Sequence, residues 1–474
     1  MKVRSDQFSR LSSEALQDEF LREALARANT SFQDAHSDAV DSMPDWQELR
    51  QQAHEIKNRA IENLPEALEA FEKNICSRGG EVHYCEDGAA ARDTILSIIR
   101  SHDGTRVTKS KSMVTEEIAL NDHLEAAGLS VLEGDLGEYI IQLAGEHPSH
   151  IIAPAIHKSR EEVAELFHEH LGSDPKADIP ELTRVAQRTL REAFLGADIG
   201  ISGANFVVSE TGTIVLVENE GNIRMSTTIP RVHIALVGIE KVVPRLEDLA
   251  LLLRLLCRSA TGQRITSYVS FISSARTPAE GDGPEKLHVV FLDAGRSRLW
   301  ADPTQREALN CIRCGACLNF CPVYGSVGGH SYGWVYPGPI GSVITPHFVG
   351  IEKASQLPQA SSLCGRCAEV CPVKIPLPDM LLGLRAKAVE AGSAGIVERF
   401  SMRVFSRLAR SPRLWRFALA CGRPVYKLAA RAGLASLLGG PLRRWSRSRG
   451  LPLPQKQGFR AWWRAGTKKG DVDG

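Results

Sequence analysis

The apolar residues of the first 75 positions recur every three or four residues, as they do along one face of a helix. The two series are Leu49, Ala53, Ile56 and Ala60, followed by Leu64, Leu68, Phe71 and Ile75. A helix with one apolar stripe buries that stripe and leaves its other face to solvent. We therefore predict two or three helices within residues 1–75 that pack on the edge of the body and take no part in chemistry.

Between residues 76 and 298 the pattern changes to short apolar runs that alternate with helical stretches. The runs lie at 105–108, 129–132 and 150–154, and the helical stretches at 89–99, 116–127, 160–170 and 179–194. This alternation is typical of an α/β domain with a parallel or mixed sheet covered by helices. We also expect a hairpin over 205–217, a linker at 275–286 and a closing strand at 287–292.

Cysteines define the next segment, residues 299–390. Seven of the eleven cysteines fall between Cys311 and Cys371. The other four are Cys76, Cys85, Cys257 and Cys421. We expect a chain of this size, without an export signal, to occupy a reducing compartment, where clustered cysteines bind metal or do redox work rather than form disulfides.

The first cysteine motif is a C-x2-C-x2-C-x3-C-P run from Cys311 to Pro322. This is the spacing of bacterial two-cluster ferredoxins, in which the fourth cysteine binds the other cluster. Three closely spaced thiolates can hold three corners of an iron–sulfur cube. Gly315 allows the backbone to lie close to the cluster, where N–H groups can reach the sulfurs.

The second motif, from Cys364 to Pro372, has the same ending, but Ser361 stands where the first motif has its leading cysteine. Crossing the last cysteine of each motif gives two ligand sets. The first is Cys311, Cys314, Cys317 and Cys371, and the second is Cys321, Cys364 and Cys367. The sequence thus predicts two [4Fe–4S] clusters. The second has a non-cysteine ligand, such as Ser361 or water, or is converted by oxidation to a [3Fe–4S] form.

Zinc is the main alternative occupant, because Zn²⁺ also takes tetrahedral sites made of four cysteines. Seven cysteines with two C-P endings favour iron–sulfur clusters over zinc. The nearby cations Arg313, Arg366 and Lys374 either offset the negative charge of the clusters, which would raise their potentials, or are ordinary surface residues.

The net charge of +1, from 57 basic and 56 acidic residues, conceals a division along the chain. Residues 399–474 hold 18 Lys and Arg against 2 Asp, so this part carries +16 and the remainder −15. The tail, residues 391–474, is predicted to be partly helical. It also holds Trp415, Trp445, Trp462 and Trp463. Such a composition suits acidic lipid head groups or an acidic partner. A solvated tail is the alternative, and nucleic-acid binding is less favoured because no nucleic-acid fold is recognisable.

Signals for a site outside the cysteines are weak. Lys109 and Lys111 precede a predicted helix, where an anion site or a simple capped helix start explains them. Glu210 is either a ligand-binding carboxylate or part of the hairpin turn at 211–212. Four histidines are expected to pack or to lie on the surface: His147, His150, His157 and His233. No Rossmann or P-loop motif follows a strand, so neither nucleotide site is supported.

A spanning helix is not expected, because no run of about 18 uncharged apolar residues is present. The N-terminal residues lack the apolar segment of a signal peptide. We therefore expect a cytoplasmic protein, with association at the inner face of the membrane left open.

Four further segments accompany the cysteine motifs: 109–118, 135–143, 151–158 and 196–205. Together they closely resemble the lactate utilisation protein B family, along nearly the whole chain and including the basic tail. The resemblance implies an α/β lactate-utilisation domain with a fold like those of sugar-phosphate isomerases and CoA transferases. It further implies a helical ferredoxin-like domain with two [4Fe–4S] clusters. It also implies A- and C-type partner subunits and electron transfer in the oxidation of L-lactate to pyruvate.

The expected organisation is a helical segment at 1–75, an α/β domain at 76–298, a two-cluster domain at 299–390 and a basic tail at 391–474. The leading hypothesis is an electron-transfer subunit of an L-lactate dehydrogenase complex, with the tail docking at a partner or at a quinone-linked acceptor on the membrane. In the alternative, the α/β domain itself binds and oxidises the 2-hydroxy acid, using Lys109, Lys111 and Glu210. A third hypothesis is a redox sensor whose tail binds nucleic acid.

Overall fold

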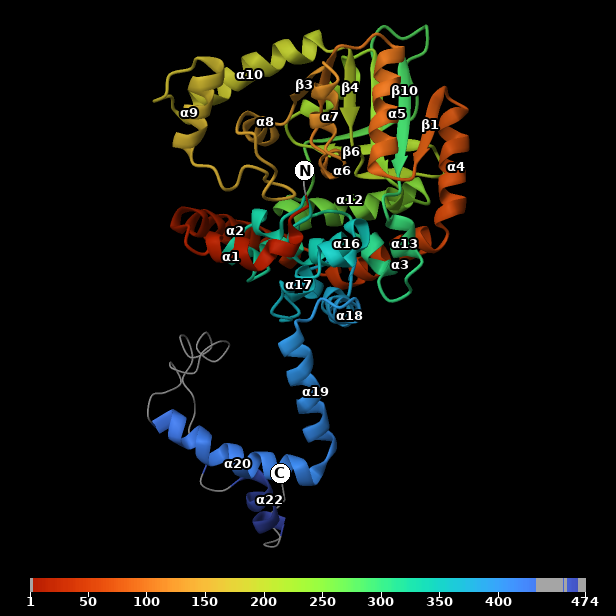
Figure 1. Ribbon diagram of the computed structural model, residues 1–474. Helices are drawn as coiled ribbons and strands as arrows, with labels where there is room; N and C mark the ends of the chain where they lie inside the picture. Colours follow the sequence, from red (N-terminus) through yellow and green to blue (C-terminus); the bar gives the residue numbers. More distant parts are fainter. Residues whose placement is uncertain (1–2, 432–454, 456–457, 468–474) are drawn as a thin grey trace. The chain divides into compact units, whose positions relative to one another are not determined.

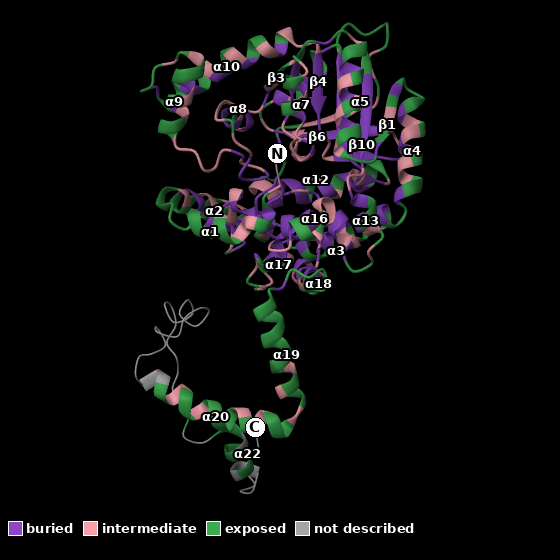
Figure 2. Ribbon diagram, viewed as in Figure 1, coloured by how far each residue is buried: buried purple, intermediate pink, exposed green. Residues whose placement is uncertain are grey.

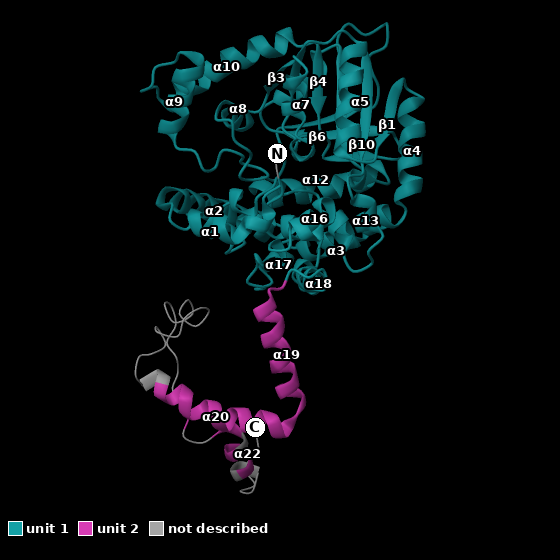
Figure 3. Cartoon of the chain, in the orientation of Figure 1, with its two compact units in different colours: residues 1–393 teal, residues 394–474 magenta. Residues whose placement is uncertain are grey.

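The computed structural model describes residues 3–431, 455 and 458–467. The chain forms two compact units, residues 1–393 and residues 394–474 (Figure 3). The first unit contains the α/β domain and both cysteine motifs, so these parts share one packed body. Trp445, which we expected to contribute to the docking surface of the tail, lies outside the described residues.

The N-terminal segment is helical, as the apolar pattern predicts, but it contains four α-helices where two or three were expected. They are α1 (Phe8–Ala15), α2 (Glu19–Asp41), α3 (Trp46–Glu62) and α4 (Leu64–Cys76). The carboxylate of Asp18 accepts the Leu21 N–H and fixes the start of α2. The prediction that these helices pack on the edge of the body was wrong for α1 to α3. These helices share one hydrophobic core with the cysteine motifs instead of lying on the edge of the α/β domain.

A six-stranded parallel sheet forms the centre of the α/β domain (Figure 1). Its order is β1 (Gly80–Cys85), β10 (Lys286–Leu292), β7 (Val232–Gly238), β4 (Ile199–Ser202), β2 (Arg106–Lys109) and β3 (Ser130–Glu133). The strand expected to close the domain, β10, therefore lies inside the sheet, between β1 and β7. Parallel strands buried on both faces need helices as cover. This architecture confirms the predicted α/β class.

Helices connect and cover these strands. They are α5 (Gly88–Ser101), α6 (Met113–Glu117), α7 (Leu120–Ala126), α8 (Leu136–Leu143), α9 (Arg160–Leu171), α10 (Ile179–Gly196), α11 (Asn222–Thr228) and α12 (Leu246–Thr261). The helix expected over 116–127 is broken at Ala119, whose φ of 50° places it in the left-handed region. In Figure 1, α5 lies beside β10 and β1, both of which it contacts.

A second, four-stranded sheet contains the predicted hairpin. Its order is β8 (Val242–Val243), β5 (Phe206–Val208), β6 (Thr213–Glu218) and β9 (Tyr268–Ile272). Strands β5 and β6 pair antiparallel, and the turn between them places Gly212 at φ 58°. An added Cβ there would lie 2.4 Å from the Ile75 nitrogen, so glycine fits the close approach of α4.

The strand expected at 150–154 is absent. Nδ1 of the buried His150 ring accepts the N–H groups of Ile152 at 3.0 Å and Ala153 at 3.1 Å. This local bonding turns the chain and leaves no extended segment for a sheet. The apolar residues predicted the burial of this segment but not its conformation.

The segment that carries the cysteine motifs consists of helices, most of them short, joined by loops. Its elements are α13 (Arg296–Trp300), η3 (Arg306–Asn310), α14 (Ala316–Asn319), α15 (Tyr324–Val327), η4 (His330–Tyr332), α16 (Gly338–Val349), η5 (Ile351–Lys353), η6 (Leu357–Gln359), α17 (Arg366–Glu369) and α18 (Leu377–Glu390). The stretch at 328–341 between the motifs buries Tyr332, Trp334 and Tyr336. Figure 2 shows this buried centre around α16.

The second unit contains α19 (Ile396–Arg410), α20 (Pro412–Arg431) and α22 (Phe459–Thr467). The partly helical character predicted for the tail is confirmed by α19. This helix has no buried residue, although Ile396, Phe400 and Phe405 are apolar. Of the helices that the structure describes, none is long and apolar enough to cross a membrane.

Candidate iron–sulfur centre

The structure brings together four cysteines from both motifs. Cys311, Cys314, Cys317 and Cys371 line one small pocket, with apolar walls that include Ile340. Burial, followed by the charges of Cys371 and Cys311, raises the pKa of the Cys314 thiol. Three of the four residues are buried, and Cys311 is half-buried. The last cysteine of the second motif therefore lies with the first three cysteines of the first motif. We call these four residues the first nest.

The other three cysteines form a second group, which we call the second nest. Burial raises the pKa of Cys367 to about 12, and the charges of Cys321 and Cys364 add to the rise. Cys321 is buried, whereas Cys364 is exposed. Backbone N–H donation from Arg366 lowers the pKa of the Cys364 thiol. The structure thus produces the crossed grouping of cysteines on which the predicted ligand sets depend.

The spacing of the sulfurs bears on whether zinc could occupy these nests. A single Zn²⁺ with Zn–S bonds of about 2.3 Å holds its four sulfurs roughly 3.8 Å apart. Among the described residues, two sets of three side chains have ligand atoms within 4.8 Å of one another, and neither includes a cysteine. Their members are Glu81, His83 and His288, and Glu146, His157 and His330. Among the described residues, no three of these cysteines have their sulfurs gathered as closely as a single zinc site requires.

The first loop of each motif has the same backbone shape. In the first, Arg313 has φ 60° and Gly315 φ 77°, and in the second, Leu363 has φ 55° and Gly365 φ 85°. Positive φ at a non-glycine residue is strained and uncommon. Its recurrence at the same offset shows two copies of one local fold.

Ser361 occupies the place of Cys311 in the second copy. The Arg313 N–H donates to Cys311 Sγ at 3.4 Å, and the Leu363 N–H donates to Ser361 Oγ at 3.1 Å. Each bond runs from residue i+2 to the side chain of residue i. The Ser361 hydroxyl is therefore placed as the Cys311 thiol is placed.

Further backbone N–H groups reach the sulfurs. The Tyr324 N–H donates to Cys321 Sγ at 3.5 Å and the Ile375 N–H donates to Cys371 Sγ at 3.4 Å. Hydrogen bonds to thiolate sulfur stabilise its negative charge and tune the potential of a bound cluster. The donor set and its hydrogen bonds fit iron–sulfur clusters.

Helix α3 holds the Cys371 loop in place. Arg50 Nε donates to the Cys371 carbonyl at 2.8 Å, and its Nη2 donates to the Ala368 carbonyl at 3.0 Å. His54 Nδ1 lies 2.9 Å from the Val373 carbonyl. The apolar spacing of α3 located its buried face but could not identify these polar contacts, because they join residues more than 300 positions apart.

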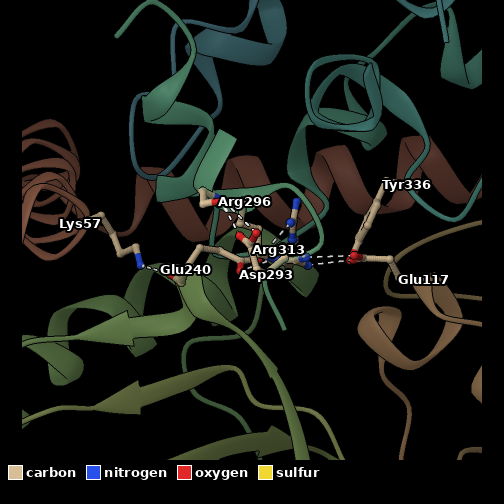
Figure 4. A network of polar contacts seen from close by, with 8 residues as sticks. Lys57, Glu117, Glu240, Asp293, Arg296, Arg313 and Tyr336 are labelled. Atoms are coloured by element: carbon tan, nitrogen blue, oxygen red, sulfur yellow. Dashed lines mark hydrogen bonds and ion pairs between the residues drawn. The ribbon is translucent and has the colours of Figure 1, made fainter. Parts of the chain in front are cut away.

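A buried charge network borders the first nest (Figure 4). Arg296 pairs with Glu240 at 2.6 Å and with Glu117 at 2.8 Å, and Arg313 Nη2 lies 3.3 Å from Glu240 Oε1. Burial opposes ionisation of Glu240, but the two arginines outweigh it and hold the pKa of this carboxyl at about 2. Lys57 Nζ donates to the Glu240 carbonyl at 2.8 Å. The network therefore keeps the ionised Glu240 between two charged arginines, while burial lowers the pKa of Lys57 to about 7.

The three cations predicted near the clusters have different surroundings. Arg313 is buried, with its guanidinium 4.7 Å from the centre of the Tyr336 ring. Arg366 pairs with Glu369 at 2.8 Å in a solvent-exposed position. Lys374 donates to Gln51 at 2.9 Å. Arg313 is thus the one of the three that takes part in the buried charge network beside the first nest.

The weaker site residues are mostly structural. Lys109 is sealed by ion pairs with Glu133 at 2.7 Å and Glu116 at 3.0 Å, so it is closed to a ligand. Glu210 accepts the Leu246 N–H and serves the start of α12. Lys111 donates to the Ile152 carbonyl and faces a cavity.

The four singled-out histidines also make structural contacts. His150 lies 2.9 Å from Asn319 within the first motif, and burial lowers its pKa to about 4. His233 contacts Ser202 Oγ at 2.8 Å. His157 bonds Glu146, and the carbonyl of His147 bonds His330. None of these four histidines lines the pocket of the first nest.

Three family models match successive parts of the chain. A LUD domain matches residues 68–292, a 4Fe-4S dicluster domain matches residues 307–375, and the C-terminal domain of lactate utilisation protein B matches residues 386–468. The dicluster match covers both nests, so iron–sulfur clusters are the cofactor class of this region.

Curated relatives match the chain over its whole length. Proteins called lactate utilization protein B from Bacillus thuringiensis (strain Al Hakam), Bacillus cereus (strain AH187) and Bacillus anthracis (strain A0248) are each 42% identical over 472 residues. Each alignment covers 99% of this chain and 99% of the relative. A crystal structure of a DUF162 family protein from Deinococcus radiodurans covers 48% of this chain and 98% of its own. At 17% identity and a TM-score of 0.27, that likeness is too weak to support a conclusion.

Proposed function

The chain belongs to the lactate utilisation protein B family, and we propose that it carries electrons through two [4Fe–4S] clusters during the oxidation of L-lactate to pyruvate. The crossed grouping of seven cysteines into two adjacent nests is the observation that supports this role most directly. Two close clusters, when bound, accept one electron each and can receive in two steps the electron pair that a hydroxy acid releases.

The residues of the chain have distinct tasks in this proposal. Cys311, Cys314, Cys317 and Cys371 hold the first cluster, and Cys321, Cys364 and Cys367 hold the second. Ser361 Oγ supplies the fourth ligand of the second cluster, since it is placed like Cys311 Sγ. Arg50 orients the loop of Cys371, and the buried cations near Cys311 favour added negative charge there.

The proposal includes A- and C-type partner subunits, which the family resemblance implies. A soluble partner or a quinone-linked acceptor on the membrane receives the electrons. The basic second unit is suited to docking: Arg399, Arg403, Arg407 and Arg410 recur along α19 at helical spacing, and apolar residues beside them are exposed. Anionic lipids attract such a surface by about 1 kcal/mol per basic residue.

Replacing these four arginines with glutamine tests the docking role. We expect binding to phosphatidylserine-containing vesicles, measured by co-sedimentation, to fall at least tenfold, with iron content unchanged. Neutral phosphatidylcholine vesicles serve as the control, because the attraction is electrostatic. Equal binding of the variant and the parent to acidic vesicles would assign docking to another surface.

The proposal of electron transfer is tested with the complex of all three subunits, purified without oxygen. L-lactate should bleach the visible absorption of the clusters in this chain, and D-lactate should do so much less. Full cluster content without any response to L-lactate would refute the assignment to lactate oxidation while leaving the cluster sites intact.

A second candidate function is oxidation of the hydroxy acid within the α/β domain itself. One observation favours it: a cavity faces the first cysteine motif and contains Lys111. Turnover of L-lactate by the isolated chain with a dye acceptor would support this candidate. Turnover only in the presence of partner subunits would count against it.

A further inference from the structure

A cavity of about 260 Å³ lies between the α/β domain and the first cysteine motif. Its walls come from segments that follow three neighbouring strands of the parallel sheet: Lys111 after β2, Gly203 after β4, and Lys241 beyond β7. Arg313 and Tyr336 close it from the iron–sulfur side. The carboxyl ends of parallel strands are the usual place for ligands in α/β sheets.

The cavity contains cationic groups without full partners. The Arg313 side chain is 10% exposed, and its Nη1 is buried without a hydrogen-bond acceptor among the described residues. No ion pair or hydrogen bond is formed by Lys241 Nζ within the part of the chain that the structure describes. One of the three N–H groups of Lys111 donates to the Ile152 carbonyl, which leaves two for a ligand. A buried guanidinium nitrogen without an acceptor is costly, so a ligand that accepts from it is favoured.

The carboxylates around the cavity are largely engaged elsewhere. Glu240 is paired with Arg296 and Arg313, and Glu218 accepts the N–H groups of Ile223 and Arg224. Asp135 accepts the Glu138 N–H at the start of α8. Glu220 is exposed. The unsatisfied groups inside the cavity are therefore donors, which selects an anion rather than a cation.

Many of the other residues that line the cavity are apolar, and they favour an anion with a carbon chain over an inorganic anion. The apolar residues are Met113, Val114, Ile151, Ile152, Leu216, Val217 and Leu236. We propose that this cavity binds a small organic carboxylate, with Arg313 and Lys241 contacting the carboxylate group and the apolar wall contacting its carbon chain. Arg313 suits this task because a guanidinium stays charged when buried, and its unpartnered Nη1 can donate to a carboxylate oxygen.

The same arginine connects the ligand to the first nest. Its backbone N–H donates to Cys311 Sγ at 3.4 Å, while its guanidinium lines the cavity. An anion bound to the guanidinium offsets the positive charge beside Cys311, which makes added negative charge there less favourable. The carboxylate should therefore lower the reduction potential of the first cluster.

The test is calorimetry on the full chain, with its clusters loaded and oxygen excluded. The inference rests on the proposed function only for the choice of pyruvate and L-lactate as probes, and inorganic phosphate is the third probe. We expect pyruvate or L-lactate to bind, and Lys241→Met and Lys111→Met each to weaken that binding at least fivefold. Lys353→Met, a change at an exposed lysine of η5, should leave binding unchanged.

Three outcomes would overturn the inference. The first is equal carboxylate binding by Lys241→Met, Lys111→Met and the parent, with iron content and circular dichroism unchanged. The second is binding of phosphate in preference to both carboxylates, and the third is binding of none of the probes at millimolar concentration. Arg313→Lys adds a second readout: the downward shift of the first-cluster potential on ligand addition should shrink. Loss of iron from the parent protein would instead refute the cluster assignment, so the two failures can be distinguished.

Discussion

The two cysteine nests share a loop shape but differ in donors and in exposure. The first has four thiols, buried walls and the network of Arg313, Glu240 and Lys57 beside it. The second has three thiols, the Ser361 hydroxyl in the fourth position, and an exposed Cys364. The two nests therefore share one backbone geometry but differ in the side-chain atoms that they offer to a cluster. The sealed nest faces the cavity of the α/β domain, and the open nest offers an exposed ligand.

This difference assigns the nests different tasks. A cluster held by three buried thiolates and one half-buried thiolate is largely protected from water and oxidants. A cluster with an exposed thiolate and an oxygen ligand is easier to reach, for a partner as well as for an oxidant. We expect electrons to enter at the first nest and leave from the second. Variants of each nest should separate the two tasks.

The largest effect is expected from Cys371→Ala. This residue belongs to the second motif, but it lies in the first nest, so the variant should lose the first cluster and keep the second. Mössbauer and EPR spectra with iron quantification would measure this. Cys321→Ala should instead lose the second cluster and keep the first. Cys76 is exposed and lies outside both nests, so Cys76→Ala should leave both clusters intact. Loss of the second cluster from Cys371→Ala would show that the ligation is not crossed.

Controlled exposure to air should separate the nests next. Because Cys364 is exposed and the proposed fourth ligand is Ser361 rather than a thiolate, the second cluster should convert first, with the EPR signal of a [3Fe–4S] form. The first cluster should persist for several times longer. Simultaneous decay of both would indicate that burial does not distinguish them.

A smaller effect is expected from Arg50→Ala, which removes the clamp on the Cys371 loop. Loss of two hydrogen bonds from a charged group should lower the free energy of unfolding by about 3 kcal/mol, measured by anaerobic denaturant titration. The first cluster should also become more labile than the second. Arg27→Ala, on the exposed face of α2, is the matched control. If both clusters became equally labile, α3 would support the region as a whole.

Ser361→Cys should have the smallest effect, but its Mössbauer spectrum should identify the fourth ligand of the second cluster. A thiolate in the Cys311-like position should complete a four-thiolate second nest, and the Mössbauer spectrum of its distinct iron should become like the others. Ser361→Ala should increase iron loss from that nest. An unchanged spectrum and unchanged iron retention in both variants would assign the fourth position to water.

Much of the fold followed from the apolar pattern, because helix and strand periods report local burial. The α/β class, α5, α10 and the hairpin at 205–217 were predicted in this way. The position of β10 inside the sheet was not, since strand order depends on packing between distant segments. The segment at 150–154 was misread because the ring of His150 forms local hydrogen bonds that compete with a strand.

The cysteine residues of the site were visible because metal-binding spacing is a local property of the chain. Arg50 and Lys241 were not, because each reaches the site through tertiary packing from an ordinary-looking segment. The sequence could not distinguish Lys109 from Lys111 either, because both are lysines two positions apart. Tertiary packing pairs Lys109 with Glu133, whereas Lys111 lines the cavity.

The central claim, that the two nests hold two iron–sulfur clusters, is tested most directly by metal and sulfide analysis of the full chain purified without oxygen. The account predicts about eight iron and eight acid-labile sulfide ions per chain. Near-zero iron with stoichiometric zinc would contradict it.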